Sequence, residues 1–525
     1  MTAPATTAPA TKMVNLTIEG RQVSVPEGTS ILEAAKYAGI LVPHYCYHPG
    51  LPVAGVCRMC LVEVEKAPKL APSCATSVAE GQVVHVHSPK ALEARKGVLE
   101  LLLINHPLDC PICDQAGECE LQDYTYMEGR ADSRLRDPKR FNPMEDFGGD
   151  VIYVTNRCIL CTRCVRFMDT VAEDPVLNVS ERGDRAVIGK FEGHDLTHPW
   201  AGNVIDLCPV GALLSKDSLN KVRAWEVDRT ASICPNCTQG CNMIVETRDN
   251  MVVRLRPRPN EAVNRFFMCD YGRLNYRWMN RQDRVDTPLV RRGSELVTAD
   301  WDIALQAAAQ LLQGAKARVV ASPMLSNEAL GLLARLARKT GGSGSYRVAK
   351  GEPAPLPGVK DLARREDLGA NVRGLELFGF TRNDTPAWNL GSGDVLIVAD
   401  EELAGINTSS IGSPRAIIVI GTTLPSWASG AAVVLPIANF AEEEGTFTNV
   451  DGRVQRFMQT KAAPGYARPS FAVLSDLLAL LGESTNYMLA SDAFAAIAAS
   501  EAPFSGLAYE TLGLRGAVVA GGTSR

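Results

Sequence analysis

The fifteen cysteines of this 525-residue chain all lie before residue 270, and their spacing sorts them into four groups. The groups are Cys46, Cys57, Cys60 and Cys74; Cys110, Cys113 and Cys119; Cys158, Cys161, Cys164 and Cys208; and Cys234, Cys237, Cys241 and Cys269. The second group is one side chain short, and His106 stands four residues before Cys110. With that histidine the side chains form four complete quartets. This count indicates that the first half of the chain binds metal.

Disulfide bonds are the other common use of many cysteines. Disulfide-rich secreted domains are short and carry cysteine throughout, whereas this chain has none after residue 269. Residues 1–12 lack the apolar core of a secretory signal and the arginines of a transit peptide, so we expect a disordered tail there. No apolar run approaches the roughly 20 residues of a membrane span. These observations favour metal binding in a bacterial cytoplasmic protein.

The first group lies in a segment that is typical of a β-grasp ferredoxin. Alternating apolar and polar residues predict two strands over 13–25, and Thr29-Ser30 then begins a helix over ILEAAKYAGI. Further strands are predicted at LVEVE and QVVHVHS. The cysteines read C-x10-C-x2-C-x13-C, with a tight pair and a distant closing ligand. A [2Fe–2S] cluster suits this fold and spacing best.

The second group reads H-x3-C-x2-C-x5-C. Ser88 is the expected N-cap of a helix that runs through ALEARKGVLELLLINH and delivers His106 to the cysteine loop. Three thiolates and an imidazole could hold zinc or a [4Fe–4S] cluster with one histidine ligand. A neutral imidazole in place of a thiolate should raise the cluster's reduction potential. The neighbouring groups favour iron–sulfur here.

The third group has the compact C-x2-C-x2-C triple of bacterial ferredoxins, closed by Cys208-Pro209, and strongly indicates a [4Fe–4S] cluster. The fourth group, C-x2-C-x3-C-x27-C, fits a [4Fe–4S] cluster or a structural zinc ion. Several redox centres in one chain make sense if electrons pass between them. The residues therefore predict electron conduction.

The residue pattern changes after residue 280, where apolar segments replace the cysteine motifs. RVVASPM, DVLIVAD and RAIIVIG are predicted as buried parallel strands, and NEALGLLARLARKT as a helix between them. The glycine-rich loop at 341–344 is expected to be a plain connector rather than a phosphate loop. No histidine follows residue 198, so an active site in this half is improbable. Glu442, Glu443 and Glu444 are expected to form a solvated surface.

Four cysteine segments resemble a known family. HYCYHPGLPVAGVCRMCLVEVE, NHPLDCPICDQAGECELQDYTY, NRCILCTRCVRF and GNVIDLCPVGAL are similar to the large iron–sulfur subunit of respiratory complex I, which in bacteria is the G subunit of NADH:quinone oxidoreductase. DRVDTPLVRRG with WDIALQAAAQLL resembles the start of a molybdopterin oxidoreductase domain. NFAEEEGTFTNVDGRVQRF, residues 439–457, resembles a segment near the C-terminal end of the same large subunit.

The resemblance implies a multidomain α+β and α/β chain. Its expected parts are a β-grasp [2Fe–2S] domain, a histidine-ligated [4Fe–4S] domain, a ferredoxin-type [4Fe–4S] domain, a [4Fe–4S] domain of molybdopterin-oxidoreductase type, and a degenerate, shortened molybdopterin-oxidoreductase-like α/β domain without its cofactor. The expected ranges are 13–88, 89–150, 151–226, 227–285 and 286–525.

The resemblance also implies a role and partners. Electrons would pass from the NADH- and FMN-binding flavoprotein subunit through the Cys46, Cys158 and His106 quartets to the subunits nearest quinone. The Cys234 quartet matches an additional cluster of some bacterial members, placed beside the main path. The chain would lie peripherally on the cytoplasmic side of the bacterial inner membrane, within the complex.

The alternatives are the alpha subunit of an NAD-linked molybdenum or tungsten formate dehydrogenase and a hydrogenase-associated diaphorase subunit. A formate dehydrogenase normally needs a metal-binding cysteine or selenocysteine and a histidine, and no cysteine or histidine follows residue 269.

Overall fold

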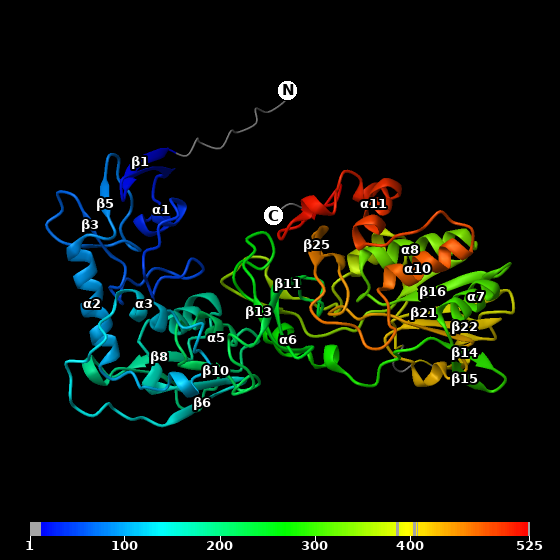
Figure 1. The fold of residues 1–525 in the computed structure, drawn as a ribbon, viewed down its shortest axis with the longest axis horizontal. Coiled ribbons are helices and arrows are strands. Elements are labelled where there is room, and N and C mark those ends of the chain that lie inside the picture. Colours follow the sequence, from blue (N-terminus) through cyan, green and yellow to red (C-terminus); the bar gives the residue numbers. More distant parts are fainter. Residues whose placement is uncertain (1–11, 385–387, 403–405, 407, 523–525) are drawn as a thin grey trace. The chain divides into compact units, whose positions relative to one another are not determined.

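The computed structural model describes residues 12–384, 388–402, 406 and 408–522 (Figure 1). Its contacts divide the chain into two compact units, residues 1–226 with 357–359 and residues 227–356 with 360–525. The tail expected at residues 1–12 lies outside the described residues except for Lys12, whose Nζ is 3.2 Å from Glu27 Oε1. Among the described helices, none has the length and apolar character needed to cross a membrane.

The first unit begins with a five-stranded β-grasp sheet in the order β2-β1-β5-β3-β4. Val14, Leu16 and Ile18 alternate onto its buried face and pack in one core with the apolar side of α1. Ser30 caps α1 by accepting a hydrogen bond from Glu33 N at 3.2 Å. The predicted strands and helix are confirmed. Their bounds are β1 Met13–Ile18, β2 Arg21–Pro26, α1 Ile31–Tyr37, β3 Leu61–Val64, β4 Ala71–Pro72 and β5 Val83–His85.

The helix predicted after Ser88 is α2, Pro89–Leu103, and Ser88 Oγ accepts from Ala91 N at 3.2 Å as expected. The helix ends three residues before His106, earlier than predicted. Pro107 follows His106, and a proline disfavours helical backbone at the residue before it. The histidine therefore lies in the loop that carries Cys110, which is followed by α3, Glu120–Glu128.

Two small antiparallel sheets and two short helices complete the first unit (Figure 1). One sheet has the order β10-β7-β6 and the other pairs β8 with β9. The loop between β7 and α4 carries Cys158 and Cys161, and Cys208 follows α5 directly. The bounds are β6 Met144–Gly148, β7 Val151–Val154, α4 Arg163–Arg166, β8 Leu177–Ser180, β9 Val187–Lys190, α5 Asn203–Leu207 and β10 Leu213–Ser215.

The second unit starts with an antiparallel meander in the order β11-β12-β13. Cys234 follows β11, Cys241 precedes β12, and Cys269 is the N-cap residue of α6. A second antiparallel sheet has the order β24-β25-β26. The bounds are β11 Asp228–Ile233, β12 Asn242–Arg248, β13 Met251–Pro257, α6 Asp270–Leu274, β24 Gly445–Thr448, β25 Arg453–Phe457 and β26 Ala517–Val518.

An eight-stranded sheet in the order β15-β14-β23-β22-β21-β16-β17-β20 forms the centre of the second unit. Six of its strands run parallel, and β14 and β15 add an antiparallel edge. The mainly parallel sheet predicted after residue 280 is confirmed. The strand bounds are β14 Leu289–Arg292, β15 Glu295–Thr298, β16 Lys316–Ala321, β17 Ser343–Tyr346, β20 Thr381–Arg382, β21 Asp394–Ala399, β22 Ala416–Gly421 and β23 Val433–Pro436. A small hairpin joins β18, Ala354–Pro355, to β19, Ala363–Arg364.

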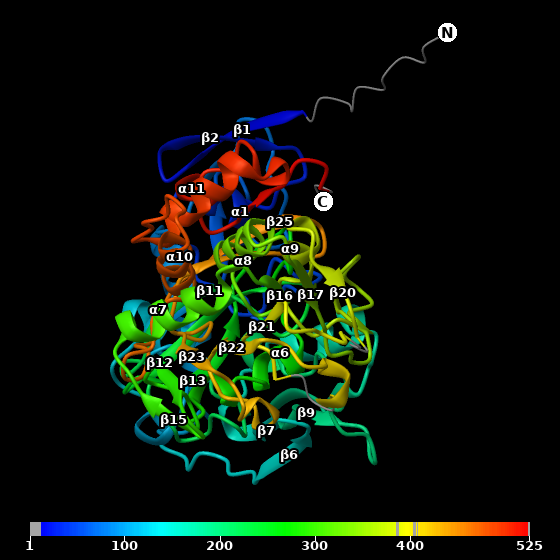
Figure 2. The same ribbon diagram turned by 90° about the vertical axis from the view of Figure 1, so that its right-hand side faces the viewer.

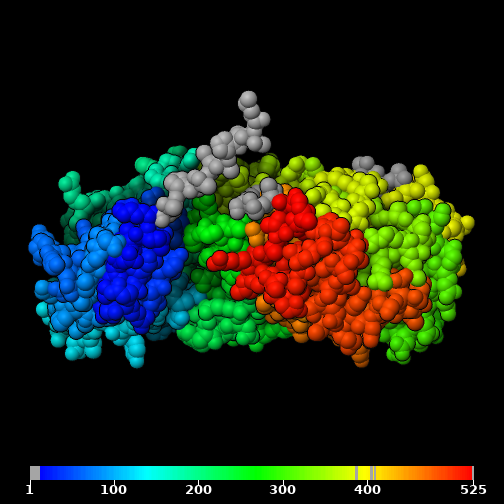
Figure 3. Space-filling model, turned by 90° about the horizontal axis from the view of Figure 1, so that it is seen from above, coloured from blue at the N-terminus to red at the C-terminus, as the bar shows by residue number. Residues whose placement is uncertain are grey.

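The sheet is buried on both faces, as its continuous apolar strands require. Along β21, Val395 and Ile397 pack into the main core with the helices, whereas Leu396 and Val398 join a separate core on the opposite face. α8 and α10 lie side by side over the first face (Figures 1 and 2). The red C-terminal segment after α11 lies at the surface of this unit beside the orange residues (Figure 3). The helix bounds are α7 Trp301–Leu312, α8 Asn327–Lys339, α9 Val372–Leu377, α10 Ser470–Leu480 and α11 Ala490–Ser500.

The expectation that Glu442, Glu443 and Glu444 form a solvated surface is wrong for two of the three. Glu442 and Glu443 are 2% and 4% exposed. Glu442 accepts two hydrogen bonds from Arg284, both at 2.8 Å, and Glu443 accepts from the Ser470 amide at 2.6 Å. These partners are remote in sequence, so the local run of acids gave no sign of them.

The glycine-rich loop at 341–344 contains a turn and the start of β17. A Cβ on Gly342 would come within 1.8 Å of Ala317 O, and one on Gly344 within 2.6 Å of the Phe380 ring. The two glycines therefore allow close packing of the sheet. This agrees with the expected structural role of the segment.

Candidate metal centres

The four thiols of the first group converge in the loops between α1 and β5. Cys46, Cys60 and Cys74 are buried, and Cys57 is partly exposed. The Cys46 amide points at Cys57 Sγ at 3.5 Å. Contacts with the Cys57 and Cys74 thiols lower the pKa of Cys46, and contact with Cys74 lowers the pKa of Cys60 to about 7. The same contacts raise the pKa values of Cys57 and Cys74, so the four thiols lie in contact with one another, as the predicted cluster requires.

The second group brings its three cysteines together. Burial raises the pKa of Cys119 to about 11, and the nearby Cys113 and Cys110 thiols add to the rise. Cys110 is exposed, and Cys113 and Cys119 are buried. A Cβ on Gly211 would lie 2.3 Å from Cys113 Sγ, so the loop after Cys208 passes directly over this thiol.

His106 has the chemical state of a metal ligand. Burial lowers its pKa to about 4, and the nearby Lys139 and Arg157 charges add to this, so the imidazole is neutral at pH 7. Its Nδ1 is buried and has no hydrogen-bond partner. Buried polar atoms are almost always paired. An orphaned, neutral nitrogen therefore suits the predicted fourth ligand, which remains a prediction.

The third group lines one small cavity, together with apolar side chains and Tyr153. Burial raises the pKa of Cys208 to about 11 and that of Cys164 well above its usual value, and the thiols reinforce the rise in one another. Burial also raises the pKa of the Cys158 thiol, and the buried Tyr153 hydroxyl, which lies against this thiol, has the smaller, opposite effect. Four thiols with raised pKa values lie close together in an apolar cavity. Binding of metal would replace their protons, so the arrangement fits the predicted cluster.

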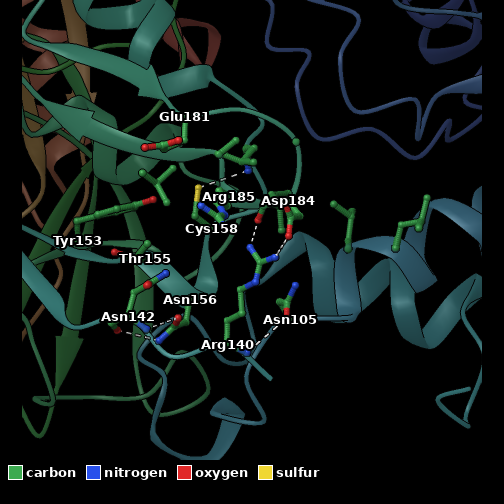
Figure 4. A pocket seen from close by; sticks show the side chains of 17 residues that line it. Asn105, Arg140, Asn142, Tyr153, Thr155, Asn156, Cys158, Glu181, Asp184 and Arg185 are labelled. Carbon is green, nitrogen blue, oxygen red and sulfur yellow. Dashed lines mark hydrogen bonds and ion pairs between the residues drawn. The ribbon is translucent and has the colours of Figure 1, made fainter. Parts of the chain in front are cut away.

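A larger, open pocket of about 670 Å³ reaches Cys158 from the surface of the first unit. Figure 4 shows Cys158 beside Tyr153 and, across the pocket, Arg140 paired with Asp184. The two asparagines at the pocket wall are joined, with Asn156 Nδ2 donating to Asn142 O at 2.9 Å. Among the cysteines of the third group, Cys158 thus borders this open pocket.

The fourth group is gathered in the second unit, and all four thiols are buried. The Cys234 amide donates to Cys241 O at 2.7 Å. A Cβ on Gly272 would lie 3.1 Å from Cys234 Sγ and 3.4 Å from Cys269 Sγ, which places these distant cysteines beside each other. Burial raises the pKa of Cys234 to about 12.

Within the part of the chain that the structure describes, no three histidine, cysteine or acidic side chains stand close enough to share a single metal ion. A cluster distributes its thiolates over several iron atoms, so its ligands stand further apart than those of one ion.

The structure also reveals residues around the sites that sequence patterns did not indicate. The Arg157 guanidinium pairs with Asp109 at 3.0 Å and so joins a neighbour of Cys158 to a neighbour of Cys110. The Glu120 amide donates to Pro209 O at 3.1 Å. The basic residues inside NRCILCTRCVRF were the only signal that could have pointed to such contacts.

Comparison with known families gives five matches along the chain. The matched descriptions are a 2Fe-2S iron-sulfur cluster binding domain over residues 11–89, the NADH-ubiquinone oxidoreductase-G iron-sulfur binding region over 95–134, the ferredoxin-like domain of NADH-quinone oxidoreductase subunit 3 over 148–214, the molybdopterin oxidoreductase Fe4S4 domain over 227–281 and molybdopterin oxidoreductase over 381–480.

Curated relatives carry consistent names. The NADH-quinone oxidoreductase G subunit of Rickettsia bellii is 41% identical over 332 residues, which cover 63% of this chain and 49% of that protein. The mitochondrial NADH-ubiquinone oxidoreductase 78 kDa subunit of Candida albicans is 43% identical over 335 residues, covering 62% and 46%. The chain thus resembles NADH-quinone oxidoreductase G subunits over about two thirds of its own length.

The G subunit of Streptomyces coelicolor extends the similarity furthest of these three relatives, with 39% identity over 379 residues, 70% of this chain and 45% of that protein. The chain thus spans about half the length of the curated relatives it matches. A crystal structure of an NAD+-reducing [NiFe]-hydrogenase in the H2-reduced state is 27% identical, with a TM-score of 0.35, covering 40% of this chain and 90% of that one.

Proposed function

We propose that this chain is an electron-carrying subunit of a proton-translocating NADH:quinone oxidoreductase. Electrons would arrive from the flavin-bearing subunit and leave toward the subunits that hold the quinone site. Iron–sulfur clusters supply reversible one-electron transfer, and the protein tunes them through ligands, hydrogen bonds and burial. The chain itself would bind neither NADH nor quinone.

The observation that carries this proposal is the convergence of the cysteines within each group, in three of the four groups from segments far apart in the sequence. Cys74 meets Cys46 from the far side of β3, and Cys269 meets Cys234 from the far side of β12 and β13. Such convergence supports one [2Fe–2S] and three [4Fe–4S] clusters. We assign iron ligation to Cys46, Cys57, Cys60 and Cys74 for the first; to His106, Cys110, Cys113 and Cys119 for the second; to Cys158, Cys161, Cys164 and Cys208 for the third; and to Cys234, Cys237, Cys241 and Cys269 for the fourth.

The fourth cluster is proposed to lie beside the main path, and no molybdopterin is expected. The proposed partners are the flavoprotein subunit that binds NADH and FMN and the subunits whose clusters continue toward quinone. The proposed location is the cytoplasmic side of the bacterial inner membrane, reached through the complex. The proposed domain ranges stay as predicted from the sequence.

Metal analysis and low-temperature EPR of the anaerobically purified chain test the proposal. We expect about 14 iron atoms per chain, from one two-iron and three four-iron clusters, and no molybdenum. Stoichiometric zinc would contradict the cluster assignment, and molybdenum with formate oxidation would favour a formate dehydrogenase.

A narrower test replaces the predicted histidine ligand. In His106→Cys, the second cluster should survive and its reduction potential should fall, because a charged thiolate makes the cluster more negative than a neutral imidazole does. An EPR spectrum and potential both equal to those of the unaltered chain would mean that His106 is not a ligand.

A further inference from the structure

The short helix α4 carries two arginines, Arg163 and Arg166, three positions apart and on either side of Cys164. Arg163 is 4% exposed, and Arg166 is partly buried. A buried guanidinium is costly unless its donors are paired. The hydrogen-bond partners of these two side chains therefore indicate their structural role.

Arg163 binds three segments that are far apart in the sequence. Its Nη2 donates to Tyr47 O at 2.8 Å, and its Nη1 donates to Leu207 O at 3.2 Å. Both nitrogens also reach the Glu120 carboxylate, at 3.2 Å and 3.3 Å. Tyr47, Glu120 and Leu207 are each the immediate chain neighbour of a predicted ligand, and the three ligands belong to the first, second and third groups.

Arg166 binds two of the ligand residues themselves. Its Nη2 donates to Cys46 O and, at 3.3 Å, to Cys161 O, while its Nη1 donates to Pro52 O. The Arg166 guanidinium therefore lies against the backbone of both the first and the third group.

We propose that Arg163 and Arg166 are positioning residues that fasten the loops of the first three cysteine groups to one helix and keep positive charge beside the first and third groups. The proposal rests on the proposed function, since it concerns clusters at those groups. It assigns α4 a role in the relay beyond the ligand Cys164.

The two arginines differ in the charge they leave at the site. Arg163 is paired with Glu120, so its contribution is mostly geometric. Among the described residues, no carboxylate pairs with Arg166, and its partners are neutral carbonyl and hydroxyl groups. A reduced cluster carries one more negative charge than an oxidised one. A nearby cation without a carboxylate partner stabilises the reduced form and raises the reduction potential.

Arg166→Gln tests the charge in the full-length, anaerobically purified chain, by redox titration followed with EPR. We expect unchanged iron content, lower potentials for the first and third clusters, and an unchanged potential for the fourth. Arg166→Lys keeps the positive charge but lacks the two terminal nitrogens of the guanidinium. The reduction potentials of its first and third clusters should lie between those of Arg166→Gln and those of the unaltered chain. Equal potentials in Arg166→Gln and the unaltered chain, or an equal shift in all four clusters, would overturn the proposal.

Arg134→Gln is the matched control, because it removes one arginine charge from the same unit at an exposed pair with Glu100. Its potentials should equal those of the unaltered chain. If the unaltered chain holds no iron, the proposed function fails. If it holds its clusters and Arg166→Gln titrates like Arg134→Gln, only the present inference fails.

Arg163→Gln tests the geometry. It leaves Glu120 without its cation and frees the segments at Tyr47 and Leu207. We expect weaker magnetic coupling between the reduced first and third clusters and slower electron equilibration between them. Arg163→Lys, which can make only part of these bonds, should fall in between. Coupling and equilibration equal to those of the unaltered chain would contradict a positioning role.

Discussion

Gly211 lies where two predicted sites meet, and replacing it with alanine gives a sharp test of the second site. A Cβ at this position would lie 2.3 Å from Cys113 Sγ and 3.1 Å from Gln115 Cβ. An ordinary contact between such atoms is about 3.5–4.0 Å, so the sulfur would have to move by roughly 1.5 Å. Ligand distances in a metal site tolerate only about 0.2 Å. The displacement is several times that tolerance.

We therefore expect Gly211→Ala to lose the second cluster and keep the other three, so that iron falls by about 4 atoms per chain. Iron analysis and EPR of the purified variant measure the loss. Gly97→Ala in α2 is the matched control, because a Cβ there meets nothing within 4 Å. Full iron content with the second cluster's signal intact in Gly211→Ala would refute the reasoning.

Three further predictions concern stability and metal loading. Arg284→Met removes the bidentate cation partner of the buried Glu442 and leaves it Lys461 at 3.5 Å and the Asn439 amide. It should cost about 3–5 kcal/mol of unfolding free energy in urea titrations. The more exposed pair of Arg382 and Asp367 should cost about 1 kcal/mol or less in Arg382→Met. Burial raises the pKa of Glu443 to about 8 from its usual 4.5, so the folded state retains a proton that the unfolded state loses, and this group lowers stability as pH rises through that window. Glu443→Gln should therefore gain stability relative to the unaltered chain between pH 5 and pH 8, and parallel pH profiles would contradict this. Burial also raises the pKa values of Cys208 and Cys234, so protons compete with iron for these sulfur atoms. The chain should therefore retain more iron against a chelator at pH 8.5 than at pH 6.5. Equal retention at both pH values would count against thiolate ligation.

Local signals explain what the sequence predicted well. The β-grasp strands alternate in polarity, and Ser30 and Ser88 cap their helices with hydrogen bonds that span three residues. The parallel strands of the second unit are apolar on both faces because both are covered. Each of these features leaves a pattern in the local sequence, so the sequence alone is enough to find it.

Contacts between distant residues explain what the sequence did not reveal. Arg163 binds Tyr47 across 116 positions, and Arg284 binds Glu442 across 158. Nothing near Glu443 in the sequence indicates that Ser470 satisfies its carboxylate. Burial of a charged side chain depends on such partners, and its own neighbours in the chain do not specify them.

The close approach of Gly211 to Cys113 also bears on how the protein is made. The predicted ligands of the second site end at Cys119, yet the segment that covers Cys113 is synthesised only after Cys208. A cluster delivered to the second site of a nascent chain would therefore sit in an unfinished enclosure. The second site is fully enclosed only once synthesis has reached residue 211.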